Sequence, residues 1–110
     1  MTRNDRDAAR WLQVKGDLYT RGGQPRRGLA LLLLAMQLAP ADVGILRTLI
    51  GSFLASGDGR RALLGLERLA QLEPQERDHL LLRCRALWLL EEREEARACF
   101  RTYLQRRSET

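Results

Sequence analysis

Residues 9–42 read ARWLQVKGDLYTRGGQPRRGLALLLLAMQLAPAD, and the residue types of this stretch return twice more with a step of 34 residues. Pro40 and Pro74 lie one step apart, and they separate the copies because Pro cannot continue a helix. Apolar residues recur within each copy at helical spacing. The sequence therefore predicts an all-α chain with three helical units, at 9–42, 43–76 and 77–110, preceded by a helical extension at 1–8. The positions that share a register are Leu12, Leu46 and Leu80; Tyr19, Phe53 and Leu87; Gly28, Ala62 and Ala96; and Leu32, Leu66 and Phe100.

This 34-residue order of aromatic, small, bulky and Pro residues resembles the tetratricopeptide (TPR) repeat, a helix-turn-helix unit stacked on its copies. The resemblance implies three tandem units that form a short right-handed solenoid with a concave groove. Gly23 and Gly57 suit the left-handed residue that ends a helix, whereas Glu91 takes this place in the third unit, so we expect that turn to be tighter or more helical. The expected helices cover residues 5–21, 25–39, 42–55, 60–72, 75–90 and 93–106.

The net charge of +5 is carried almost entirely by arginine, since Lys15 is the only lysine. A basic protein can bind acidic proteins, nucleic acid or an anionic membrane surface. Acidic residues are interspersed with the arginines, however, and no aromatic residues alternate with them as in proteins that bind single strands. We therefore expect no nucleic-acid partner.

The composition offers no catalytic or metal-binding constellation. His79 is the only histidine, and no second base, Gly-rich phosphate loop or metal-ligand spacing accompanies it. Cys84 and Cys99 lack the spacing of metal ligands, so we expect buried free thiols. The sequence thus predicts a protein that is not an enzyme and that needs no metal or cofactor.

The sequence also favours a cytoplasmic location. The charged segment Met1–Arg10 lacks the apolar stretch of a secretory signal. The longest apolar run, Leu29–Met36, is too short to span a bilayer.

The first helix of each TPR unit lines the concave side, so its inward-facing residues are candidate partner contacts. Their character changes from polar to apolar along the chain. Trp88 is the natural anchor because Trp and Arg dominate binding energy at interfaces, although an ordinary half-buried core position would also explain it. An amphipathic helix or an extended apolar segment would fit this groove. The candidates are Arg10, Gln13, Asp17, Thr20, Arg47, Gly51, Leu54, Leu81, Arg85 and Trp88.

A second candidate surface lies on the convex side, at Leu33 and Leu34. The later units place Glu67 and Arg68 at these positions, which indicates that both positions face solvent. We expect a partner or a second copy of the chain to cover the two leucines. The alternative is that the segment 1–8 covers them.

Arginine pairs form a third unusual feature. Arg26-Arg27 and Arg60-Arg61 begin the second helix of their units, where cations are unfavourable, and Glu94-Glu95 stands there in the third unit. The pairs are either a basic edge for an acidic partner or ordinary solvated arginines.

Almost the whole chain resembles the YscY-like family of type III secretion chaperones, which includes PscY and AscY. The resemblance is carried by Trp11-Leu12-Gln13, Gly16-Asp17-Leu18-Tyr19, Leu38-Ala39-Pro40 and Leu72-Glu73-Pro74. It implies a bacterial chaperone that binds a small YscX-like export protein in its concave groove and presents it to the export gate. Contact with the membrane machinery would then be peripheral and through protein, and the free chaperone could form a homodimer. A needle-subunit chaperone, a generic TPR adaptor and an RNA-binding TPR protein are the alternatives.

Overall fold

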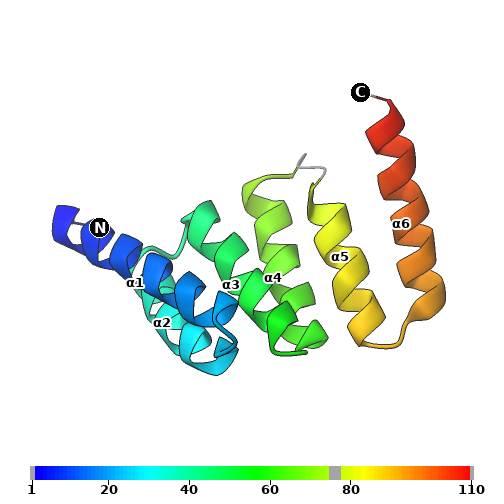
Figure 1. Ribbon diagram of the computed structural model, residues 1–110. Helices are drawn as coiled ribbons and strands as arrows, with labels where there is room; N and C mark the ends of the chain where they lie inside the picture. The colour runs from blue at the N-terminus through cyan, green and yellow to red at the C-terminus, as the bar shows by residue number, and fades with distance from the viewer. Residues whose placement is uncertain (1, 75–77, 110) are drawn as a thin grey trace.

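The computed structural model describes residues 2–74 and 78–109, and six α-helices account for most of them (Figure 1). The predicted ranges agree with these helices to within about the two residues by which such assignments differ. The expected start at residue 75 lies outside the described residues. The helices are α1 (Arg3–Arg21), α2 (Pro25–Leu38), α3 (Val43–Ala55), α4 (Gly59–Leu72), α5 (Asp78–Leu89) and α6 (Arg93–Ser108).

The helices form a row in chain order, from α1 at one end to α6 at the other (Figure 1). Each helix packs on the next, as expected for sequential helix-turn-helix pairs. In addition, α1 contacts α3 and α3 contacts α5, whereas no contact joins α2 to α4 or α4 to α6 among the described residues. The molecule is elongated, with principal dimensions of 43 × 28 × 20 Å.

The turns inside the three pairs share one conformation. Gly23, Gly57 and Glu91 all adopt positive φ, at 87°, 80° and 62°. In each turn the N–H of this residue and the N–H of the next residue donate to carbonyls of the preceding helix, which is the Schellman pattern. The expectation of a tighter or more helical third turn is therefore wrong: these hydrogen bonds hold Glu91 in the left-handed conformation that its neighbours reach with glycine.

The first pair is held close by small residues. A Cβ on Gly28 would lie 2.2 Å from Thr20 Oγ1 and 2.6 Å from the carbonyl oxygen of Gly16, so only glycine allows α2 to approach α1 at this point. Ala62 and Ala96 occupy the same register in the other units, and both are buried. Small residues at this position therefore set the spacing inside each pair.

The core is continuous through the middle of the row. Leu32, Ile50 and Leu69 are fully buried and belong to one cluster that extends from α2 to α5. Phe100 shares the register of Leu32 and Leu66 yet is exposed, because no later helix of the described chain packs on α6.

Candidate functional site

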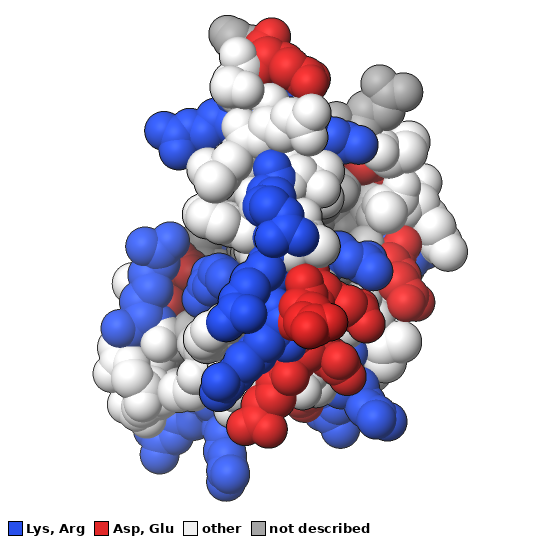
Figure 2. Space-filling model, turned by 90° about the vertical axis from the view of Figure 1, so that its right-hand side faces the viewer, with Lys and Arg blue, Asp and Glu red and all other residues white. Residues whose placement is uncertain are grey.

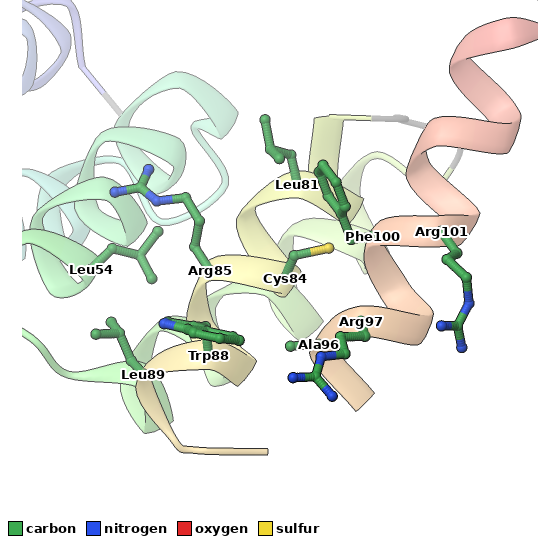
Figure 3. Close-up of a pocket in the computed structure, with 10 residues that line it drawn as sticks. All are labelled: Leu54, Leu81, Cys84, Arg85, Trp88, Leu89, Ala96, Arg97, Phe100 and Arg101. Carbon is green, nitrogen blue, oxygen red and sulfur yellow. The ribbon is translucent and has the colours of Figure 1, made fainter. Parts of the chain in front are cut away.

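The C-terminal half of the molecule contains an apolar cavity of about 580 Å³. Figure 3 shows Phe100 leaning from α6 toward Leu81 on α5, with the Trp88 ring below Cys84. Leu54, at the end of α3, is buried and contributes to the wall next to α5. The cavity is lined by Leu54, Leu81, Cys84, Arg85, Trp88, Leu89, Ala96, Arg97, Phe100 and Arg101.

Trp88 is the largest side chain of this cavity and remains 54% exposed. It is therefore no ordinary core residue, and its ring is available to a ligand. The guanidinium carbon of Arg93 lies 5.3 Å from the ring centroid, a cation–π contact that orients the indole. The tryptophan is thus held in place without being covered.

Arginines surround the cavity. Arg85 and Arg101 extend away from its centre, and Arg97 lies beside Ala96 (Figure 3). No ion pair joins Arg85, Arg97 or Arg101 to an acidic side chain within 2–74 and 78–109. Figure 2 shows the same end of the molecule, where a column of basic side chains runs beside a group of acidic ones. An acidic group bound near the cavity would therefore find several cations.

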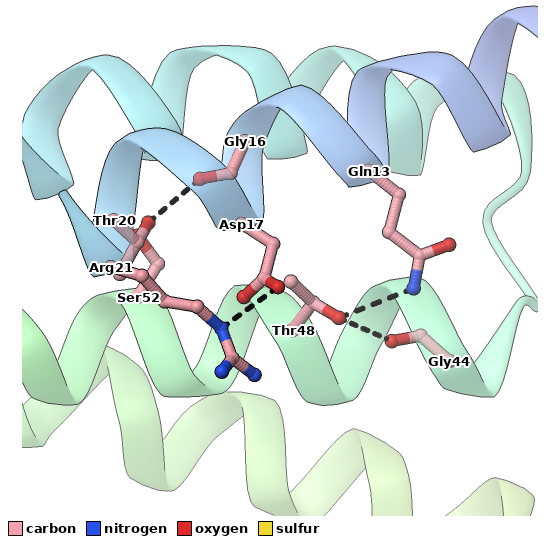
Figure 4. Close-up of polar contacts among 8 residues, drawn as sticks. All are labelled: Gln13, Gly16, Asp17, Thr20, Arg21, Gly44, Thr48 and Ser52. Carbon is pink, nitrogen blue, oxygen red and sulfur yellow. Dashed lines mark hydrogen bonds and ion pairs between the residues drawn. The ribbon is translucent and has the colours of Figure 1, made fainter.

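A second hollow, of about 370 Å³, lies between α1 and α3 and is polar. Figure 4 shows its hydrogen bonds: Thr20 Oγ1 lies 2.9 Å from Ser52 Oγ and donates to the Gly16 carbonyl oxygen. Gln13 Nε2 donates to Thr48 Oγ1 across the same two helices, at 3.2 Å. The hollow is lined by Asp17, Thr20, Arg21, Arg47, Thr48, Gly51 and Ser52.

The predicted groove residues thus divide between two hollows. Asp17, Thr20, Arg47 and Gly51 line the polar one, and Leu54, Leu81, Arg85 and Trp88 line the apolar one. The remaining two lie in neither. Arg10 is exposed on α1, and Gln13 is engaged with α3 through Thr48.

Gly51 adds no side chain to the polar hollow, and a Cβ built at this position meets nothing within 4 Å. Arg47 forms an ion pair with Glu73, so its charge is already matched within the chain. The polar hollow is therefore better satisfied internally than the apolar cavity.

Leu33 and Leu34 of α2 are exposed, as expected. Leu33 is 44% and Leu34 50% accessible, so the described part of the N-terminal segment does not cover them. The arginine pairs are also solvent-accessible, and Arg61 forms an ion pair with Asp58, the residue that caps α4. Neither set of residues lines the apolar cavity or the polar hollow.

The two cysteines are free thiols. Cys84 is buried, and burial together with a hydrogen bond to Cys99 raises its pKa to about 12. Cys99 is partly buried, and its thiol donates to the Leu80 carbonyl oxygen at 3.4 Å. Cys84 therefore stays protonated and unreactive near neutral pH, as a structural residue does.

Arg97 and Arg101, two residues of α6 that line the cavity, were missed by sequence reasoning. Repeat register assigns Ala96 and Phe100 to packing between helices, and nothing in the sequence identifies Arg97 or Arg101 as cavity residues. Phe100 and Leu104 are exposed, because no later helix of the described chain packs on α6.

Within the described residues, no helix is long and apolar enough to cross a membrane, and no three His, Cys, Asp or Glu side chains gather as metal ligands. A comparison with models of known protein families found no match, and a comparison with curated proteins found no significant similarity.

Proposed function

We propose that this protein is a non-enzymatic chaperone of the TPR type, which binds and stabilises a small export protein of a bacterial type III secretion system. The apolar cavity between α3, α5 and α6 is the observation that carries the proposal. The binding event is the insertion of an apolar segment of the export protein into this cavity. The chaperone then presents its cargo to the export gate from the cytoplasmic side.

The helix contacts support a TPR-like arrangement. Among the first helices of the pairs, α1 touches α3 and α3 touches α5, whereas no contacts among the described residues join the second helices. A curved array with its first helices on the inner side would have this pattern. The three Schellman turns support equivalent units as well.

The chemistry of the cavity supports a polypeptide ligand. Helical ligands dock by placing apolar anchors into a groove, and interface hot spots are enriched in Trp and Arg. Trp88, Phe100 and Leu81 offer such a surface while remaining accessible to solvent. A cluster of large exposed apolar side chains is unfavourable in water and marks an interaction site.

The sequence resemblance to the YscY-like chaperones supports the identity of the cargo as a YscX-like protein. Because no family model matches, this part of the proposal depends on the repeat and on the motifs around Trp11, Gly16 and Pro40. If the cargo is a needle subunit, the protein is the needle-subunit chaperone of type III secretion, the alternative that the sequence also offers.

The test is co-expression of the tagged protein with the products of its neighbouring open reading frames, followed by mass spectrometry of what copurifies. A small secreted protein is the expected result. A copurified needle subunit would identify the protein as the needle-subunit chaperone instead. Copurified nucleic acid, or no copurified polypeptide at all, would contradict the proposal.

Two tryptophan variants then locate the binding site. Trp88→Ala should weaken the complex by at least about tenfold, because interface anchors contribute more than 1–2 kcal/mol each. Trp11→Ala is the matched control, since Trp11 is equally exposed but lies on α1, away from the cavity. Equal losses in the two variants would show that the cavity is not the binding site.

A further inference from the structure

The outer side of α1 carries an apolar stripe that the proposed cargo site does not use. Trp11, Val14 and Leu18 are 58%, 52% and 58% exposed. At about 100° per residue, they lie roughly 140–160° around the helix from Gly16, whose face packs against α2. Together with Asp7 and Arg21 they form the outer stripe of α1, in which residues are spaced alternately by four and three positions, as in a coiled-coil seam.

The outer stripe is nearly symmetric about its centre. Val14 lies midway between Asp7 and Arg21, which carry opposite charges. A second α1 laid antiparallel across the stripe would place each Asp7 opposite Arg21 of the other copy, and each Trp11 within one residue, about 1.5 Å along the axis, of the point opposite Leu18. A parallel arrangement would instead bring like charges together at both ends. The stripe is therefore complementary to an antiparallel copy of itself.

A neighbouring pair of charges has the same symmetry. Arg10 and Asp17 flank the stripe on one side, and the same antiparallel pairing brings each Arg10 within one residue of the point opposite Asp17 of the other copy. Asp7 and Arg10 form no ion pair within the described residues, so their charges are available. The existing pair between Arg21 and Asp17 is an exposed one at 2.9 Å, and exposed pairs contribute little to stability.

The shape of the surface beside the outer stripe fits the same antiparallel pairing as its charges do. A hollow of about 220 Å³ lies beside Leu18, at the end of the stripe opposite Trp11, and Gly22 contributes no side chain to it. The antiparallel arrangement carries the Trp11 indole of the second copy to this hollow. Lys15, which also lines it, has its ammonium 5.7 Å from the centroid of its own Trp11 ring, so its charge is directed along the same surface.

We propose that two copies of this chain associate through the outer stripe of α1, antiparallel and two-fold symmetric, with each Trp11 seated in the hollow beside Leu18 of the other copy. An interface that uses the same patch on both subunits is the commonest form of homodimer. The exposed leucines of α2 are a poorer surface for self-association, since α2 contains two arginines and no acidic residue. The cavity at α5 and α6 stays open in this dimer, so the inference does not depend on the proposed function.

The test is sedimentation equilibrium of the purified protein alone over a wide concentration range. We expect a reversible dimer, and Val14→Glu should convert it to a monomer with an unchanged helical circular dichroism spectrum. Leu34→Glu is the matched control, because it adds the same charge at an equally exposed position, and it should leave the dimer intact. A protein that stays monomeric up to about 1 mM, or a dimer that Leu34→Glu disrupts and Val14→Glu does not, would overturn the proposal.

Charge reversal tests the orientation. Asp7→Arg and Arg21→Asp should each raise the dimer dissociation constant about tenfold, because each change creates two symmetric like-charge contacts. The double variant should return to within about threefold of the unmodified protein, since the opposite charges face each other again. A double variant that remains as weak as the sum of its two changes would exclude the antiparallel pairing.

Discussion

Replacing Glu91 with glycine should stabilise the protein, although the substitution adds no new contact. Glu91 adopts φ 62°, and the left-handed conformation costs a residue with a Cβ about 1–2 kcal/mol. Glycine avoids this cost but gains freedom in the unfolded chain, which removes about 0.4–1 kcal/mol of the benefit. The net gain should be about 1 kcal/mol in the free energy of unfolding, or roughly 4–8 °C in Tm for a domain near this size.

Thermal unfolding followed by circular dichroism measures this gain, and Gly57→Glu provides the reciprocal variant. It places a glutamate at the equivalent left-handed position of the second turn, where an added Cβ meets nothing within 4 Å. We therefore expect a loss of similar size, and the double variant should resemble the unmodified protein. A Glu91→Gly variant with an unchanged or lower Tm would refute the idea that backbone conformation governs this turn.

Three further substitutions test the packing and the thiol. Gly28→Ala should lower the free energy of unfolding by about 1–3 kcal/mol in urea titrations, because the added Cβ would overlap Thr20 and α1. Thr20→Val should cost about 1–2 kcal/mol in the same assay, since it removes the hydrogen bond between Thr20 and the buried Ser52 hydroxyl, whereas Thr102→Val, which removes an exposed hydrogen bond on α6, should cost less. The pKa of Cys84 is raised from 9.0 to about 12 in the folded protein, so the folded state binds the proton more tightly and stability should fall as pH rises from about 9 toward 12. Denaturant titrations across this range should show the slope, and Cys84→Ala should reduce it.

Most of the helical framework could be predicted from the repeat. Prolines mark the ends of units, glycines mark turns, and apolar residues recur at helical spacing, so each helix was expected close to its observed place. These signals are local, because they depend on backbone freedom and on which face of one helix is apolar. The conformation of Glu91 could not be obtained in this way, since it is imposed by hydrogen bonds to carbonyls of α5 rather than by the residue itself.

The candidate sites were only partly accessible to sequence reasoning. Leu81, Arg85 and Trp88 were expected in the groove and do line the apolar cavity, but repeat register placed Phe100 in the core. Whether such a residue is buried depends on a helix packed over it, which a register cannot report. The outer stripe of α1 was missed for a related reason: Trp11 and its neighbours lie on a face that would be internal in the middle of a longer array.

The contacts among α1, α3 and α5, without contacts among α2, α4 and α6 in the described chain, give the row an unequal resistance to bending. Besides these contacts, α2 packs on α3 and α4 packs on α5, so each pair is joined to the next by two seams. A small rotation of one pair against the next would disturb these seams but no packing between α2 and α4 or between α4 and α6. A change in the curvature of the row is therefore opposed only at the seams between consecutive pairs.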